Sequence, residues 1–407
     1  MKERTGRARM WFYLICGLSV ISNFSYYPFF QETSWAHPAV MTIWAAMVVI
    51  LVLIPGKIRI QDRYLAVILF LYVLFILSNL TELVFGNTEV FGNIFFRNIS
   101  MAAAVLLLGN RAGMHFTREE IEKICLVYMY AGFAMALAFL LFHARHIDFD
   151  SRIYTYNNIK NSISVIFLAA SAAACFVFHP RNRLLLVIRT AGILVCMLAA
   201  ALLRCRSVML AYVLLAVLCV ILPRGVTGGL RWPVLFMASA LGLWMLLDQN
   251  SRWYILERII LAGRSGNLDA LSSGRLTLIS QGLEVILKHP FLGVGKYKTL
   301  DCFYVSVFVS YGLVLAWPAV FIAFMPLAAA IRYIKSNGKP EWLLFALAVL
   351  FLTIALLEEQ MPFGPGVRCY ILWLLLGLLM GSGEAKRYIP GEGQPDDSYQ
   401  GTDDKTV

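Results

Sequence analysis

The sequence predicts an all-α polytopic integral membrane protein with about twelve transmembrane helices. Of its 407 residues, 60% are hydrophobic and only 14% are charged. Soluble globular domains carry about 25% charged residues, so this composition excludes an ordinary soluble protein. About twelve apolar runs are long enough to cross a bilayer. They cover residues 10–30, 38–54, 64–80, 91–108, 123–142, 162–178, 184–203, 207–222, 232–247, 303–331, 341–357 and 367–381.

Basic residues in alternate loops orient these spans. Cytoplasmic loops of membrane proteins are enriched in Lys and Arg, so this rule places six basic groups, and with them both termini, in the cytoplasm. The groups lie at residues 2–9, 57–63, 111–118, 181–183, 224–231 and 332–339. Because the net charge of +11 is spread over these short loops, it does not indicate nucleic-acid binding.

Loops on the opposite face should be poor in basic residues, but three of them are not. Arg204-Cys205-Arg206, residues 143–161 and residues 248–302 all keep several. Basic groups held outside against the bias indicate an anionic ligand, although a long loop is exported whatever its charge. Both explanations fit the long loop. At Arg204 and Arg206, which follow the end of a span, an anionic ligand is the better explanation.

We take residues 1–407 as a single membrane domain with two long polar segments. Residues 248–302 are the large external loop predicted by the alternation of the spans. Residues 384–407 are polar and rich in acidic side chains, which predicts a disordered cytoplasmic tail.

The external loop contains an amphipathic helix, predicted at Leu276–Lys288. Its apolar residues recur at intervals of three and four, and polar residues occupy the other side. The apolar set is Leu276, Ile279, Leu283 and Ile286, and the polar set is Thr277, Gln281, Glu284 and Lys288. His289-Pro290 ends the helix, and Gly293 and Gly295 then permit a tight turn back to the membrane at about Phe303.

Short motifs exclude several enzyme classes. The sequence has no phosphate-binding P-loop, HExxH, CxxC or GxSxG pattern, so ATP-driven, zinc-hydrolase and serine-hydrolase functions have no support. Asp148-Phe149-Asp150 in a predicted outer loop could hold a divalent metal, as such pairs do in some glycosyltransferases. A solvated loop explains these acids as well, and we expect neither a metal nor another cofactor.

Three motifs resemble those of a known superfamily. Residues 272–312 combine Ser273-Gly274-Arg275, the amphipathic helix, a His-Pro-Phe-Leu-Gly-Val-Gly turn and Tyr311-Gly312-Leu313. Arg204-Cys205-Arg206-Ser207 precedes a span, and Asn157–Ser162 begins another. Together they resemble the signature region, the Ser/Arg motif and the asparagine-bearing motif of the O-antigen ligase and O-antigen polymerase superfamily.

The resemblance implies a GT-C-like glycosyltransferase in the plasma (inner) membrane, with its active site on the external face. Family members transfer a glycan from undecaprenyl diphosphate to an acceptor hydroxyl. We therefore expect an enzyme that polymerises lipid-linked repeat units into a capsular, exopolysaccharide or O-antigen chain. Its partners would be the undecaprenyl-diphosphate-linked donor, a glycan acceptor, the lipid bilayer and other polysaccharide assembly proteins.

The positions that match the family's diphosphate-binding arginines are Arg206, with Arg204 as the other candidate, and Arg275. Guanidinium groups are permanently charged and bind phosphate bidentately, so they suit a diphosphate leaving group without a metal. Residues two apart on a helix point about 200° apart, so Arg204 and Arg206 should not both face one site. The alternative for Arg275 is an ion pair with Asp269 or Glu284.

The base that activates the acceptor is less well defined. Ligases of the family carry a histidine after the Gly-x-Gly turn, but residues 298–304 contain none, which favours a polymerase. Asp301 could accept the proton or cap the next span. Glu358-Glu359-Gln360, in an outer loop, could contact sugar hydroxyls, pair with Arg368 or be solvated.

Two alternative functions stay open. The first is a ligase that moves a finished glycan to a lipid, a wall polymer or a protein. The second is a secondary transporter or flippase, because Arg97 and Arg189 lie inside apolar runs. Transporters usually show internal repeats, whereas this sequence shows none and gathers its unexpected basic residues on one outer face.

Overall fold

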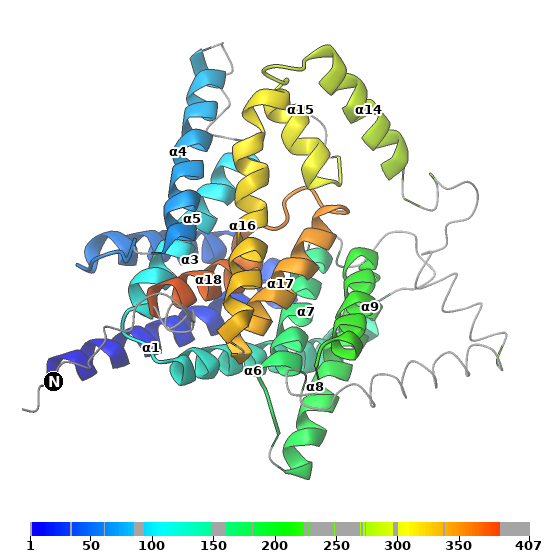
Figure 1. The fold of residues 1–407 in the computed structure, drawn as a ribbon. Coiled ribbons are helices and arrows are strands. Elements are labelled where there is room, and N and C mark those ends of the chain that lie inside the picture. The colour runs from blue at the N-terminus through cyan, green and yellow to red at the C-terminus, as the bar shows by residue number, and fades with distance from the viewer. Residues whose placement is uncertain are drawn as a thin grey trace, which may run out of the picture.

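The computed structural model of the chain, drawn in Figure 1, is built from helices wherever it is described. It describes residues 2–32, 35–60, 62–84, 93–147, 159–180, 182–223, 274–295, 300–336 and 338–382, with Tyr156, Thr227, Asp248, Asp269 and Ser272. The expected span 232–247, most of the loop 248–302, the acidic motif 148–150 and the tail 384–407 lie outside the described residues.

The α-helices fall into two sets that flank the largest of these gaps. Those before it are α1 (Lys2–Phe24), α2 (Pro28–Glu32), α3 (Ala36–Leu53), α4 (Arg63–Val84), α5 (Ile94–Gly113), α6 (Arg118–Phe142), α7 (Lys160–Phe176), α8 (Arg183–Leu202) and α9 (Arg206–Ile221). Those after it are α14 (Arg275–Lys288), α15 (Phe303–Leu315), α16 (Trp317–Tyr333), α17 (Lys339–Ala355) and α18 (Tyr370–Ser382). Short 3₁₀ helices lie at η2 (Ala144–His146), η4 (Ile334–Ser336) and η5 (Gly366–Cys369).

Apolar helices confirm that the chain is a membrane protein. Among the described residues, α4, α6 and α8 are long and apolar enough to cross a bilayer, and the pair α15–α16 adds a fourth crossing if it is one span. Many large apolar side chains on α4 and α8 are exposed, as expected for helices that face lipid. The number of twelve spans and the GT-C-like arrangement stay predictions.

One expected span is not a single straight helix. Residues 303–331 were expected to cross as one unit, but α15 and α16 meet at an angle of 118°, visible as the sharp bend near the top of Figure 1. Gly312 inside α15 has φ 72° and ψ 177°, a conformation open to glycine alone, and Pro318 follows at the start of α16. The run is apolar throughout, but the Gly312 conformation and Pro318 interrupt the helix.

The centre of the molecule is formed by α7 and α18. Every residue from Ser162 to Phe176 of α7 is buried, and so is every residue of α18 from Tyr370 to Gly381. Helix α18 lies directly against α5, where a side chain at Gly109 or Gly377 would collide with the opposite backbone. Small residues at such crossings let membrane helices approach closely, so this pair forms a tight core.

Contacts between the described loops form two groups. In the first group, Tyr333 donates a hydrogen bond to Asp62 at 2.7 Å, and Lys339 forms an ion pair with Glu122 at 3.0 Å. These contacts join two of the basic segments predicted to be cytoplasmic, 57–63 and 332–339, to each other and to α6. The second group joins the beginnings of α7 and α9 to the segment after α17, and it contains the candidate site.

Candidate active site

The turn between α8 and α9 carries two of the predicted diphosphate ligands. Arg204 lies in this turn with φ 54°, a left-handed conformation that is uncommon outside glycine, and only 4% of it is exposed. Arg206 is the first residue of α9 and is half-buried. The expectation that Arg204 and Arg206 diverge as residues of one helix does not apply, because α8 ends at Leu202 and the turn breaks the helical geometry.

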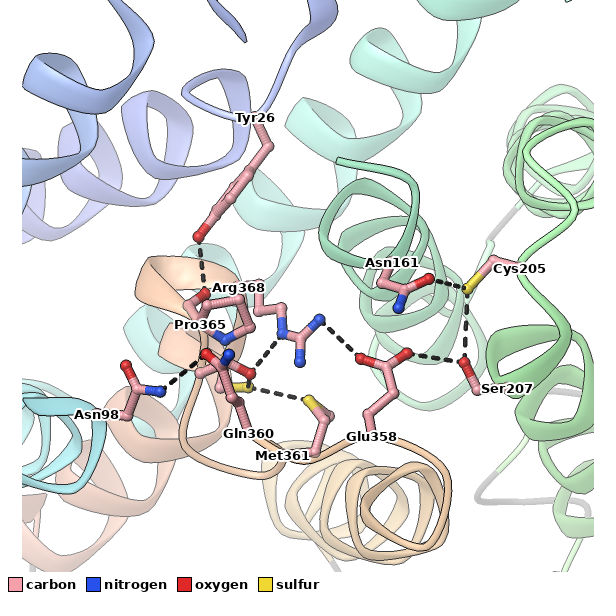
Figure 2. A network of polar contacts seen from close by, with 12 residues as sticks. Tyr26, Asn98, Asn161, Cys205, Ser207, Glu358, Gln360, Met361, Pro365 and Arg368 are labelled. Carbon is pink, nitrogen blue, oxygen red and sulfur yellow. Dashed lines mark hydrogen bonds and ion pairs between the residues drawn. The ribbon is translucent and has the colours of Figure 1, made fainter. Parts of the chain in front are cut away.

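Side chains beside Arg206 join the beginnings of two helices (Figure 2). Cys205 donates a hydrogen bond from Sγ to Oδ1 of Asn161 at 3.3 Å, and Ser207 donates from Oγ to Oε1 of Glu358 at 2.8 Å. Asn161 is the second residue of α7. The arginine-bearing and asparagine-bearing motifs of the sequence therefore meet at one place.

Glu358 is the centre of this network. Its second oxygen, Oε2, lies 2.8 Å from Nη1 of Arg368, and the two side chains are only 5% and 3% exposed. Nε of Arg368 donates to the carbonyl of Gly364 at 2.5 Å (Figure 2). Of the interpretations left open for these acids, pairing with Arg368 is confirmed for Glu358. A buried ion pair is stable only when its remaining polar atoms also have partners, which Ser207 and Gly364 supply here.

The loop after α17 is fixed from its other side as well. Asn98 of α5 donates from Nδ2 to Oε1 of Gln360 at 3.1 Å, and the hydroxyl of Tyr26 donates to the carbonyl of Pro365 at 2.7 Å. No sequence pattern predicted these two hydrogen bonds. The one signal available was Asn98, a polar residue inside an expected span, and such residues are usually functional or structural contacts.

The amphipathic helix predicted at Leu276–Lys288 is confirmed as α14, and its first residue is Arg275. Nε of Arg275 lies 3.3 Å from Oδ2 of Asp301, with side chains 20% and 41% exposed. The ion-pair partner of Arg275 is thus Asp301, whereas the sequence offered Asp269 or Glu284 as alternatives. Asp269 instead accepts hydrogen bonds from the backbone N and Oγ1 of Thr277, at 2.9 and 2.7 Å, and these bonds lower the pKa of Asp269.

Asp301 lies in a turn immediately before α15. Its φ is 51°, so the chain passes through a second left-handed residue at the site. The residue at the N-terminal boundary of α15 is Cys302, and no side chain caps that helix. Asp301 is therefore the counter-ion of Arg275 rather than a helix cap. The structure brings these two predicted residues together, while Arg204 and Arg206 lie in the segment whose Ser207 bonds Glu358.

Glu359 adjoins both groups. It is half-buried, and it follows Glu358 directly in the chain. The pKa of Glu359 is raised to about 7, chiefly by burial and also by the negative charge of Asp301, while hydrogen bonds from the Ser306 side chain and the Leu300 backbone oppose the rise. Phe303 and Phe363 pack the same two segments together, with ring centres 5.6 Å apart and ring planes tilted by 54°.

The glycine turn after α14 fastens this helix to the membrane-embedded helices. Val294 N donates to Val309 O at 2.9 Å, and Gly295 N donates to Ser310 O at 3.0 Å. A side chain at Gly293 would collide with the backbone of α15, so only glycine allows this close approach. On the outside of this unit, several apolar side chains stay exposed, namely Leu276, Leu283, Leu287 and Phe291.

Comparison with known proteins agrees with this arrangement. A family model described as O-antigen ligase matches residues 191–310, which include Arg204, Arg206, Arg275 and Asp301. No curated protein matches the chain. The family match confirms the resemblance of the motifs: residues 191–310 of this integral membrane protein are similar to the O-antigen ligase family.

Proposed function

We propose that the chain is a glycosyltransferase that polymerises undecaprenyl-diphosphate-linked oligosaccharide repeat units into a cell-surface polysaccharide. The observation that carries this proposal is that contacts link the three motif segments. Cys205, at the beginning of α9, bonds Asn161 of α7, and Ser207 bonds Glu358 in the loop after α17. Arg275, at the beginning of α14, pairs with Asp301 before α15, where Phe303 packs on Phe363 of the same loop.

Arg206 and Arg275 are the proposed ligands of the donor diphosphate, with Arg204 as a further candidate. When the glycosidic carbon leaves the phosphate oxygen, negative charge develops on that oxygen. Guanidinium groups that are already in place stabilise this charge, and they do so most effectively where water is scarce. In this proposal the step needs no metal, and Asp301 keeps Arg275 oriented until the donor arrives.

The proposed orientation places this site on the external face of the plasma membrane, with both termini in the cytoplasm. The contacts of Asp62 with Tyr333 and of Lys339 with Glu122 support this orientation, because they hold predicted cytoplasmic segments together. The bilayer would deliver the lipid-linked donor, and other polysaccharide assembly proteins would supply repeat units and receive the polymer.

A ligase is the second candidate, because the matching family model is described as O-antigen ligase. The chemistry at the diphosphate is the same, and only the acceptor differs. A ligase would transfer a finished glycan to a lipid, a wall polymer or a protein. The absence of histidine from residues 298–304 favours the polymerase. A transporter or flippase has no comparable support from the site.

Deleting the gene and separating the undecaprenyl-linked glycans by size tests the proposal. A polymerase leaves single repeat units unjoined, so these should accumulate. Accumulation of long lipid-linked chains would identify a ligase instead. An unchanged glycan profile would overturn both assignments, and uptake of labelled substrate into vesicles would then identify a transporter.

A further inference from the structure

The two adjacent acids of the loop after α17 have different surroundings. Both oxygens of Glu358 are already engaged, one by Ser207 and the other by Arg368, each at 2.8 Å. This carboxylate is nearly buried and is fully occupied in holding three segments together (Figure 2). Glu358 is therefore a structural anchor, and it is not placed to exchange a proton with a substrate.

Glu359 lies on the other side of this anchor, toward the turn before α15. The charge of Asp301 acts on its carboxyl group, and the backbone of Leu300 donates a hydrogen bond to it. Asp301 in turn forms the ion pair with Arg275. Glu359 thus adjoins Glu358, which bonds Ser207 next to Arg206, and it adjoins the turn in which Asp301 pairs with Arg275.

We propose that Glu359 is the catalytic base of the transfer, an inference that rests on the glycosyltransferase function proposed above. Its carboxylate takes the proton from the acceptor hydroxyl. The freed electron pair of that oxygen forms the new bond to the anomeric carbon of the donor. The bond from this carbon to the phosphate oxygen breaks, and its electron pair leaves on the lipid diphosphate, where Arg206 and Arg275 bind the charge.

The acidity of Glu359 suits this role. A general base is most effective when its pKa lies near the working pH, and burial beside Asp301 raises the pKa of Glu359 to about 7. Below that pH the carboxyl is protonated and accepts no proton, so the transfer rate should fall as the pH is lowered. Asp301 is the competing candidate, but its Oδ2 atom already faces Arg275.

The test compares Glu359→Gln, Glu359→Asp and Asp301→Asn in the purified full-length protein. The donor is the undecaprenyl-diphosphate-linked repeat unit isolated from cells that lack the gene. Polymer formation is followed from about pH 5 to about pH 8, and equilibrium binding of radiolabelled donor is measured in parallel. Glutamine keeps the shape of the side chain and its capacity to accept a hydrogen bond, so a purely structural role survives this change.

We expect Glu359→Gln to slow transfer by about 10²- to 10⁴-fold without loss of donor binding. It should also remove the fall in rate at acidic pH. Glu359→Asp keeps a carboxyl group and should retain measurable transfer with an acidic limb in its pH profile. Glu119→Gln is the matched control, because Glu119 is 78% exposed on α6 and lies outside the site. This control should behave as the wild type.

Three results would contradict the proposals, and they are distinguishable. Wild-type rates in Glu359→Gln across the pH range would overturn the role of Glu359. An acidic limb that disappears in Asp301→Asn while Glu359→Gln retains it would assign the base to Asp301. If the wild-type protein forms no polymer from a donor that it binds, the polymerase function itself fails, and the inference falls with it.

Discussion

The guanidinium of Arg368 lies 2.8 Å from the carboxylate of Glu358, and both side chains are almost completely buried. The pair connects the loop after α17 to η5, and through Ser207 it also connects the loop to α9. Desolvating two charges is costly, and the attraction between them offsets that cost only while both are present. The integrity of the candidate site therefore depends on one buried ion pair.

Arg368→Ala should destabilise the protein strongly. It leaves the Glu358 carboxylate buried with a single donor, which costs about 3–5 kcal/mol for a buried pair that loses one partner. The measurement is the thermal transition of the purified protein in detergent. A double replacement, Glu358→Leu with Arg368→Met, should recover much of that loss because it removes both charges. Equal stability of Arg368→Ala and the wild type would show that the pair does not hold the loop.

Ser207→Ala should loosen the beginning of α9. The Ser207 hydroxyl donates to a charged acceptor, and such hydrogen bonds contribute about 1.5–3 kcal/mol. Because Arg206 is the adjacent residue, donor binding should also weaken. Ser207→Thr retains a hydroxyl and serves as the control. Loss of donor affinity in Ser207→Ala that Ser207→Thr does not share would support a positioning role, whereas equal affinities would contradict it.

Arg206→Ala and Arg275→Ala should each abolish long-chain polymer while the protein still inserts into the membrane. Each removes a permanent charge from the proposed site of the leaving diphosphate. Lysine at either position keeps the charge but not the planar fork, so partial activity is expected. Polymer length is measured in cells carrying each variant, beside a membrane-fraction immunoblot. Arg183→Ala, an exposed change in the first turn of α8, is the control. Normal chain lengths in both alanine variants would refute the assignment.

Gly312→Ala should destabilise the bend between α15 and α16. The backbone at Gly312 has φ 72° and ψ 177°, a region that costs other residues about 1–3 kcal/mol. A side chain there would also press on the carbonyl of Phe291. Gly17→Ala in α1 is a suitable comparison, because an added methyl group meets no neighbour, and alanine is the better helix former. We expect the thermal transition to fall in the first variant and to hold or rise in the second.

Local sequence patterns predicted much of the helical framework. The runs expected at 162–178, 184–203 and 207–222 correspond to α7, α8 and α9 within about two residues, because an apolar run reports directly on a buried or lipid-facing helix. The run 303–331 was expected to be one helix, but the structure has two helices, bent by 118°. Composition predicts how apolar a segment is, but it cannot predict that Gly312 adopts a positive φ and interrupts the helix.

The site was harder to predict because its contacts are distant in the sequence. Ser207 and Glu358 are 151 residues apart, and no periodicity connects them. The motifs predicted Arg206 and Arg275 as diphosphate ligands, and this stays a prediction. The alternatives for the acidic loop included the Arg368 pair, which the structure contains. The placement of Glu359 beside the turn that contains Asp301 follows only from the packing of α15 against the loop after α17.

The exposed apolar side chains of α14 have a consequence for how the donor reaches the enzyme. Leu276, Leu283, Leu287 and Phe291 would rest in the headgroup layer of the outer leaflet, and the glycine turn prevents the helix from rising away from it. Arg275 would then sit at the depth where a lipid-anchored diphosphate travels. The donor and the protein would then meet by diffusion within the plane of the membrane. Because bilayer thickness sets the depth of the diphosphate relative to Arg275, the rate of transfer should change with bilayer thickness even when every residue of the site is unchanged.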